Sequence, residues 1–228
     1  MRNKPNAQYN LAKPDSTAVR IATHVRSQMF AMFMSEFDPT EADEVIDLGV
    51  TSDQSYQSSN YFEAVYPYKN RITAAGIDDG SFLEAIYPGV RFVFANALNL
   101  PFSANSFDYV HSSAVLEHVG TYANQQRMFG ECLRVARKGV CLTTPNRWFP
   151  IEFHTQIPLL HWLPKSWFRR LLDAMGQHEL AMETNLNLMT EGELRKIAAS
   201  HPDWSFHFRS CHVLGWKSNI VLFAAKKT

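Results

Sequence analysis

Short apolar runs alternate with helix-like segments through the first two-thirds of the chain, and this alternation limits the fold more than any other feature. The runs have the length and composition of buried strands. They cover residues 44–49, 71–77, 90–94, 107–112 and 140–144. Strands that alternate with helices pair in parallel, through right-handed crossovers. The pattern therefore predicts an α/β fold with a doubly wound sheet and helices on both of its faces.

Helix signals fill the gaps between these runs. An apolar residue recurs every three to four positions from Ala18 to Phe33, which predicts an amphipathic helix that ends before Asp38. A short helix is expected over 61–66. Two S/T-x-x-E patterns predict capping boxes at the starts of two further helices, and these patterns begin at Ser81 and Thr190.

Another helix is predicted between the fourth and fifth strands. Met128, Cys132 and Val135 mark its buried face, and Gly139 is expected to end it. The C-terminal part has a different pattern, because two strand-like segments are joined there by a turn that contains Gly215. Adding this antiparallel pair gives a Rossmann-like sheet of seven strands, mostly parallel with an antiparallel C-terminal strand pair.

The composition excludes several classes of protein. The 22 basic and 22 acidic side chains cancel, so no nucleic-acid partner is expected. Hydrophobic residues make up 46% of the chain, too many for a disordered protein. Because the three cysteines lack metal-ligand spacing, neither a disulfide framework nor a metal is expected. The polar N-terminus and the absence of an apolar window long enough to span a bilayer favour a cytoplasmic location.

Polar residues follow the predicted strands, where a doubly wound sheet binds its ligands. Residues 49–53 follow the first strand, Asp78 and Asp79 follow the second, and Ser112 and Ser113 end the fourth. Asp78 lies about 30 positions beyond the first strand, a spacing compatible with a carboxylate that accepts hydrogen bonds from the two hydroxyls of a ribose. The sequence therefore predicts contacts to a ribose, a base and a reacting group along one crevice.

Four motifs carry a resemblance to a known family. They are A-N-A-L-N-L-P-F at 95–102, S-F-D-Y-V at 106–110, L-E-H-V at 116–119 and T-T-P-N-R at 143–147. With the acidic end of the second strand, they resemble class I S-adenosylmethionine-dependent methyltransferases, in particular the small-molecule branch with L-P-F and F-D-x-V signatures. The resemblance covers about residues 45–147 and the terminal strand pair. It implies S-adenosylmethionine as cofactor and methyl transfer to a small-molecule or lipid- or glycan-linked acceptor.

The resemblance also assigns cofactor contacts. It places Asp47 and Gly49 beside the methionine portion and Asp78 on the ribose, with Asn96 and Ala97 facing the adenine. An asparagine carbonyl can accept the adenine hydrogen bond that the family's more usual aspartate accepts. Further cofactor contacts are expected from the neighbouring residues Thr51, Ser52, Asp79, Ser112 and Ser113.

The loop after the first strand departs from the family pattern. Where the family has D-x-G-x-G-x-G, residues 47–53 contain a single glycine, Gly49. Glycines permit close backbone approach and positive φ, so either this loop has a different shape that uses the Thr51 and Ser52 hydroxyls, or the site is weakened. A weakened site would suit a cofactor-binding regulatory domain or pseudoenzyme. A nicotinamide oxidoreductase is disfavoured, because no G-x-G-x-x-G follows the first strand.

Histidines are the candidate catalytic residues. Methyl transfer from a sulfonium depends mainly on positioning, and a hydroxyl acceptor also needs a base, for which neutral histidine is suited near neutral pH. His118 follows the fourth strand, whereas His154 and His161 follow the fifth, where the family places acceptor-contacting groups. These three histidines favour O-methylation, and structural packing is the alternative for each. Glu117 is expected to be a solvated or capping carboxylate.

The chain is expected to form a single methyltransferase domain over 1–228, with a helical cap over 1–40. Residues 147–188 are its most aromatic part and are expected to form a lid or acceptor insertion. Within this segment, one helical face is expected to carry Trp167, Leu171, Leu172 and Met175, and the basic residues Lys165, Arg169 and Arg170 flank it. That pattern suits a lid helix packed on the sheet, and it also suits a helix in peripheral contact with a membrane.

Overall fold

The computed structural model describes residues 16–54, 56 and 59–227. Its central element is a seven-stranded sheet. The strand order is β3-β2-β1-β4-β5-β7-β6. The strands are β1 (Val45–Leu48), β2 (Ile72–Gly76), β3 (Arg91–Phe94), β4 (Phe107–Ser113), β5 (Ala136–Pro145), β6 (Trp204–Val213) and β7 (Trp216–Lys226). Strands β1 to β5 run parallel, and β7 pairs antiparallel with both β5 and β6. The predicted fold class is confirmed.

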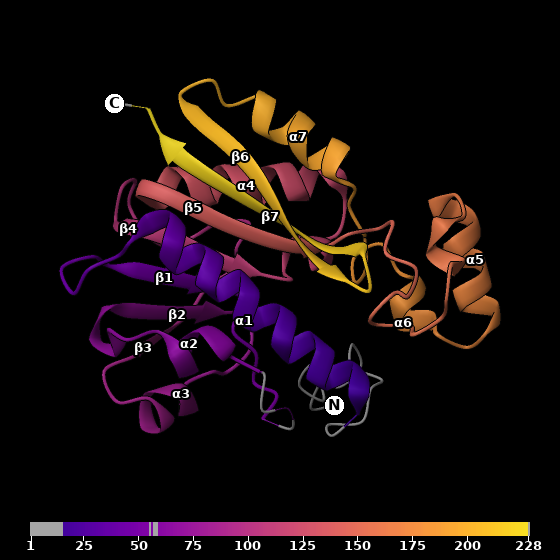
Figure 1. The fold of residues 1–228 in the computed structure, drawn as a ribbon, viewed down its shortest axis with the longest axis horizontal. Coiled ribbons are helices and arrows are strands. Elements are labelled where there is room, and N and C mark those ends of the chain that lie inside the picture. The colour runs from indigo at the N-terminus through magenta and orange to yellow at the C-terminus, as the bar shows by residue number, and fades with distance from the viewer. Residues whose placement is uncertain (1–15, 55, 57–58, 228) are drawn as a thin grey trace.

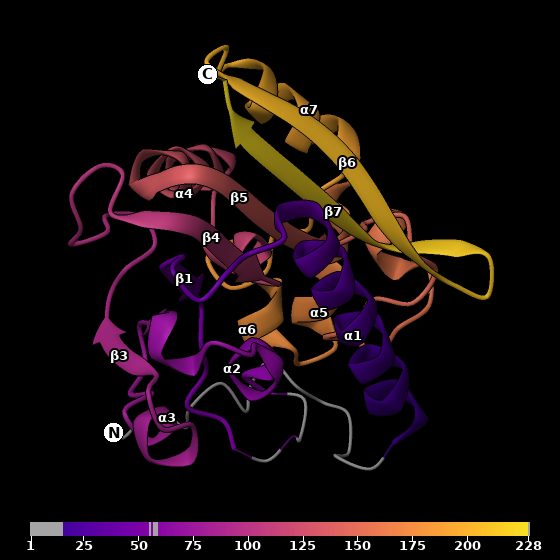
Figure 2. The same ribbon diagram turned by 60° about the vertical axis from the view of Figure 1, so that its left-hand side comes forward.

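Helices cover both faces of this sheet (Figures 1 and 2). One face carries α1 (Thr17–Phe37), α2 (Tyr61–Val65) and α3 (Phe82–Ile86), and the other carries α4 (Tyr122–Val135) and α7 (Glu191–Ala199). Because successive side chains of a strand point to opposite faces, Val45 belongs to the buried cluster with α1, α2 and α3, and Ile46 to the one with α4 and α7. The sheet therefore lies between two apolar cores.

The strand order reverses between β1 and β4, which places the ends of these strands around a crevice. The 3-10 helix η1 (Lys69–Arg71) leads into β2, and η2 (Leu116–His118) follows β4. Beyond the carboxyl ends of the parallel strands lie η3 (Leu160–Trp162), α5 (Lys165–Ala174) and α6 (His178–Ala181), at the right of Figure 1. Residues 1–15 of the expected N-terminal cap lie outside the described residues.

Several predicted boundaries are confirmed. Helix α1 ends at Phe37, and Asp38 adopts a left-handed φ of 42°. The capping box of α7 forms between Thr190 and Glu193. Gly215 has a φ of +82° in the turn between β6 and β7.

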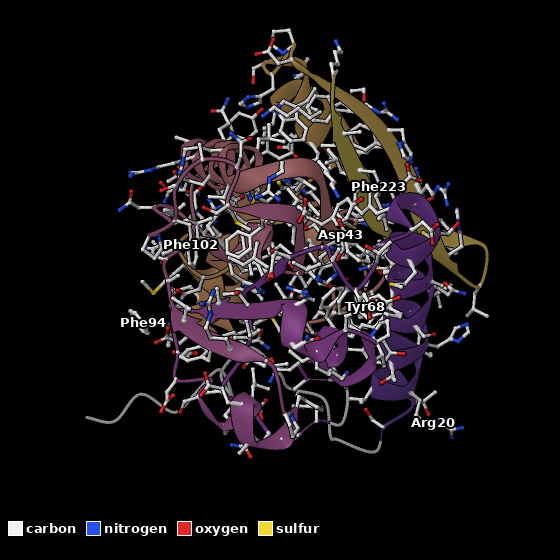
Figure 3. All side chains as sticks on the ribbon, turned by 90° about the vertical axis from the view of Figure 1, so that its left-hand side faces the viewer. Arg20, Asp43, Tyr68, Phe94, Phe102 and Phe223 are labelled. Atoms are coloured by element: carbon white, nitrogen blue, oxygen red, sulfur yellow. The ribbon has the colours of Figure 1, made fainter. Side chains whose placement is uncertain are left out.

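The role predicted for Gly139 was wrong. Helix α4 ends at Val135, and Gly139 lies inside β5, which begins directly after the helix. A Cβ at this position would come within 2.6 Å of the Phe37 ring. That ring also lies 5.6 Å from the ring of Phe223, which Figure 3 shows beside α1. Gly139 therefore makes room for the end of α1 against the sheet.

The capping box predicted at Ser81 was also wrong. The Ser81 side chain makes no cap hydrogen bond at the start of α3, and its backbone N–H donates to Asp79 Oδ1 at 3.0 Å. Glu84 Oε1 accepts instead from the backbone N–H of Phe92 at 2.8 Å. The two side chains of the motif thus do not cap each other, and Glu84 ties α3 to the edge strand β3.

Candidate functional site

A cavity of about 590 Å³ opens at the carboxyl ends of β1, β2 and β4, where the strand order reverses. This volume is typical of small-molecule and cofactor sites. Most of the predicted cofactor residues line the cavity, and so do two of the three candidate histidines. The predicted residues in its wall are Asp47, Gly49, Thr51, Asp78, Asn96, Ala97, Ser113, His118 and His154.

Three predicted cofactor residues, Ser52, Asp79 and Ser112, do not line the cavity. The Ser112 hydroxyl donates to the Leu48 carbonyl at 3.0 Å and so joins β4 to β1. Asp79 accepts the hydrogen bond at the start of α3. The Ser52 hydroxyl is buried and has no hydrogen-bond partner among the described residues. The structure therefore gives Asp79 and Ser112 structural contacts.

The loop after β1 is held by Asn60, a residue that sequence reasoning missed. The Thr51 backbone N–H donates to Asn60 Oδ1 at 2.8 Å, and Asn60 Nδ2 donates to the Thr51 carbonyl at 2.9 Å. Asn60 has a φ of 52°, which asparagine tolerates better than most residues. Gly49, at φ +95°, is needed because a Cβ there would lie 2.1 Å from a Val115 methyl group. The loop thus needs one glycine, and an asparagine side chain fixes its shape.

A buried polar cluster forms the cavity wall at the end of β1. Asp47 Oδ1 lies 2.5 Å from His111 Nδ1 of β4. The Phe62 ring of α2 stacks on His111 at a centroid distance of 4.3 Å. Glu63, the next residue, is fully buried, and neither of its carboxyl oxygens has a hydrogen-bond donor among the described residues. Its carboxyl group is satisfied if it is protonated and donates to Asp47.

Burial sets the protonation of this cluster. Burial, followed by the charge of Asp47, raises the pKa of Glu63 well above its usual value. Burial also raises the pKa of Asp47 to about 7 and lowers the pKa of His111 to about 4. His111 is therefore neutral, Glu63 keeps its proton, and any negative charge in the cluster is carried by Asp47. This charge faces the cavity.

His118 and His154 meet elsewhere in the cavity wall. Their Nε2 atoms lie 3.1 Å apart, and the rings are nearly perpendicular. The Nδ1 atom of His118 lies 2.6 Å from the Asn185 carbonyl oxygen, and that of His154 lies 2.6 Å from Glu152 Oε1. Both Nδ1 atoms therefore carry a proton, because their partners can only accept. A hydrogen bond between the two Nε2 atoms requires a further proton on one ring.

Glu152 decides which ring carries that proton. Burial lowers the pKa of His154, but the charge and hydrogen bond of Glu152 outweigh it and raise that pKa above its usual value. Burial, followed by the charge of His154, lowers the pKa of His118 to about 4. Although burial raises the pKa of Glu152, the charge of His154 and the local hydrogen bonds hold it at about 2. His154 is therefore the imidazolium and His118 the neutral ring.

Glu117 lies beside this pair, and the prediction that it is solvated was wrong because its side chain is fully buried. Thr144 Oγ1 donates to Oε2 at 3.0 Å, whereas Oε1 has no hydrogen-bond partner among the described residues. Oε1 lies 4.0 Å from His118 Nε2. Burial raises the pKa of Glu117 to about 7.

His161 does not line the cavity. It is buried, and its Nε2 donates to the Phe149 carbonyl at 2.7 Å. The structure therefore does not bring His161 together with the other two candidate histidines. Sequence reasoning missed Glu152, for which the Glu-x-His spacing to His154 was the available signal.

The segment after β5 has an apolar core of its own. This core joins α5 and α6 to the stretch that precedes α7, and it is separate from the two cores of the sheet. Its buried members are Phe168, Leu172, Leu180, Leu186 and Leu188. Helix α5 turns Trp167 and Met175 outward, with 60% and 55% of their surface exposed. The aromatic segment thus has an apolar cluster of its own, and hydrogen bonds such as that between His118 and the Asn185 carbonyl tie it to the sheet end.

Glu63→Gln is expected to flatten the pH dependence of stability. Because the pKa of Glu63 is raised from 4.5 in the folded state, the proton it holds stabilises the fold fully below about pH 4.5. This stabilisation is lost as the pH rises through the raised value, by up to about 1.4 kcal/mol per pH unit. Urea unfolding from about pH 5 to 8 measures the slope. Glu41→Gln, an exposed control, should keep the wild-type slope, and an unchanged slope in Glu63→Gln would contradict the assignment.

Comparison with known proteins agrees with this arrangement. Residues 59–143 match a family model described as a methyltransferase domain. This stretch begins after the loop that follows β1, and it ends within β5. A search of curated proteins found no match.

Solved structures share the fold over most of their length. The PH0226 protein from Pyrococcus horikoshii is 13% identical, with 96% of this chain and 95% of that chain covered and a TM-score of 0.60. Magnesium protoporphyrin IX methyltransferase from Synechocystis, solved with bound SAH, is 14% identical, with 92% and 86% covered and a TM-score of 0.57. The 1,6-didemethyltoxoflavin-N1-methyltransferase from Burkholderia thailandensis is 14% identical, with 94% of this chain and 80% of that chain covered and a TM-score of 0.58.

The matched stretch contains β2 to β4 and most of β5, and it includes the cavity-lining residues that follow β2, β3 and β4. The flanking elements complete the seven-stranded sheet that the solved methyltransferases share with this chain. The match over residues 59–143 identifies a methyltransferase domain, and most of the chain shares its fold with solved S-adenosylmethionine-dependent methyltransferases.

Proposed function

We propose that the protein methylates a small molecule or a lipid- or glycan-linked acceptor, with oxygen as the preferred acceptor atom. The observation that carries this proposal is that one cavity is lined both by Asp78 and Asn96 and by the His118–His154 pair. Carboxylate and amide groups suit a nucleoside, and imidazoles suit the activation of a hydroxyl group. The cofactor and the acceptor would thus meet in a single hollow.

The residues present fit the cofactor. When bound, S-adenosylmethionine supplies a methyl group that is already activated on a sulfonium. Asp78 would accept hydrogen bonds from its ribose, and the negative charge at Asp47 would favour the ammonium group of its amino acid portion. Asn96 Oδ1 accepts from the Leu98 backbone N–H at 2.9 Å, and its second lone pair remains for the adenine amino group. The missing Cβ of Gly49 leaves the strand end close to Val115.

His118, the neutral ring of the pair, would take the proton of the acceptor hydroxyl, and the imidazolium of His154 would hold it in position. Both rings line the cavity, and oxygen partners at both Nδ1 atoms fix their orientation. Glu152 acts through His154 and is a positioning residue. Residues 147–188 would form a lid that limits the access of water to this end of the site, which strengthens the electrostatic interactions inside.

The outward face of α5 is proposed to contact a membrane surface when the acceptor is lipid-linked. Trp167 is 60% exposed, and the neighbouring Arg170 on the same helix is also exposed. Apolar and basic side chains on one short helix suit the boundary between lipid headgroups and acyl chains.

We also propose a cytoplasmic location. Cys132, Cys141 and Cys211 are all buried and free, as is usual in a reducing compartment. None of the helices that the structure describes combines the length and the apolar character needed to span a bilayer.

Asp78→Ala is expected to weaken the binding of S-adenosylhomocysteine by about 1–3 kcal/mol, because hydrogen bonds to a charged group are lost. Isothermal titration calorimetry measures the change. Asp79→Ala is the matched control: the neighbouring carboxylate caps α3, does not line the cavity and should leave the affinity unchanged. Equal affinities in wild type and Asp78→Ala would contradict the ribose assignment.

His154→Ala is expected to reduce methyl transfer by about 100-fold or more while the affinity for S-adenosylhomocysteine stays near that of wild type. Transfer of a radiolabelled methyl group to a panel of hydroxyl acceptors provides the measurement. His212→Ala, on the exposed face of β6, should retain wild-type turnover. Cofactor binding without transfer to any acceptor would favour a regulatory domain, and equal turnover in His154→Ala would remove this residue from the mechanism.

Trp167→Ser is expected to reduce co-sedimentation of the protein with anionic lipid vesicles. Removal of the indole takes away the largest apolar group on the outward face of α5. Phe94→Ser is the control, because Phe94, labelled in Figure 3, is 68% exposed and belongs to the edge strand β3 instead of α5. If neither wild type nor Trp167→Ser sediments with vesicles, the membrane contact is wrong.

A further inference from the structure

We propose that Glu117, His118 and His154 bind one divalent transition-metal ion in the cavity wall. Each residue offers one ligand atom, and these three atoms lie within 4.8 Å of one another. The cysteine spacing that argued against a metal bears only on thiolate sites, and this set contains imidazole and carboxylate ligands.

The distances between the ligand atoms allow one ion to bind all three. Two imidazole nitrogens bound to one zinc ion at about 2.0–2.1 Å lie roughly 2.9–3.4 Å apart, depending on the angle between them. The Nε2 atoms of His118 and His154 are 3.1 Å apart. Glu117 Oε1 lies 4.0 Å from His118 Nε2, so the carboxylate has to move inward by about 1 Å. The two nitrogen ligands are therefore already in place.

The atom of each proposed ligand that faces away from the ion position is fixed by a hydrogen bond, as in known metal sites. Metal-binding histidines usually donate their other ring N–H to a carboxylate or a backbone carbonyl. Here the Asn185 carbonyl oxygen and Glu152 Oε1 each lie 2.6 Å from an Nδ1 atom. Thr144 donates to the second oxygen of Glu117 at 3.0 Å. These contacts leave Nε2 of both rings and Oε1 of Glu117 directed toward one another.

The carboxylate of Glu117 is incompletely satisfied without an ion. Glu117 is fully buried, yet its Oε1 has no hydrogen-bond partner among the described residues, whereas buried polar atoms normally have one. The contact between the two Nε2 atoms needs an extra proton, which a metal ion would replace. When ionised, Glu117 and Glu152 supply two negative charges beside the histidine pair, and a divalent ion would take the place of the proton shared by the two rings. The local charge therefore favours a cation.

The ligand set selects the kind of ion. Two imidazoles and one carboxylate suit zinc and the neighbouring first-row ions, whereas calcium and magnesium prefer oxygen ligands alone. Three protein ligands leave a coordination position for a further group, as in catalytic zinc sites. Resting on the proposed function, the inference is that the acceptor hydroxyl occupies this position, where binding to the ion lowers its pKa. The two histidines would then activate the acceptor by holding the ion.

Zinc titration of the full chain, after dialysis against a chelator, tests the site without reference to activity. Calorimetry should give one Zn²⁺ ion per chain, and Co²⁺ should give the visible absorption of a low-symmetry site. Glu117→Gln and His154→Ala should each abolish the tight site, and Glu152→Gln, which removes an outer contact, should weaken it about 10–100-fold. His178→Ala should bind like wild type, because its exposed ring forms a surface pair with Asp173 at 2.6 Å.

Other outcomes would overturn the site. The site is wrong if wild type does not bind Zn²⁺, or if wild type and Glu117→Gln bind it equally. Circular dichroism has to show that both proteins are folded. Glu117→Gln keeps the side-chain volume and an oxygen for Thr144, so it is the variant least prone to unfold. A further result would be methyl transfer that a chelator does not affect in wild type but that is lost in His154→Ala. That result would reject the metal site and retain the proposed function. Failure of S-adenosylhomocysteine to bind would reject the proposed function alone.

Discussion

The hydrogen bond between Asp47 and His111 joins β1 to β4 at the point where the strand order reverses. The chain segments that follow these two strands diverge there, and a buried polar pair links the paired strands below the cavity. Such a pair is costly to desolvate. Aromatic rings from α1 and α2 offset part of this cost, because Phe33 and Phe62 both pack against His111. The cavity wall thus depends on the helices of one face being seated correctly.

Much of the fold follows from local patterns. Apolar runs, helical periodicity and the Thr190 capping box each depend on residues that are neighbours in sequence, so the sequence alone predicts them. Gly139 shows the limit of this logic. A glycine after a helical segment is typical of a helix end, but its place is set by Phe37, which comes from a distant part of the chain.

The candidate site divides in the same way. Asp47, Asp78 and Asn96 can be predicted because topology brings strand ends together, whatever the details of packing. The roles of Asn60 and Glu63 depend on which side chain faces which after folding, so no local pattern predicts them, and the Glu-x-His spacing of Glu152 was the one local signal among the three. Glu117 was misjudged because a carboxylate beside a histidine looks the same in sequence whether it is exposed or buried.

The segment between β5 and α7 packs around leucines of its own and leaves the two cores of the sheet intact. Substitutions that reshape it therefore need not disturb the end of the site proposed for the nucleoside. Under the proposed function, such a division would allow acceptor preference to diverge by exchange of one segment, with the donor half inherited unchanged. Grafting this segment between homologous enzymes is a direct route to altered selectivity.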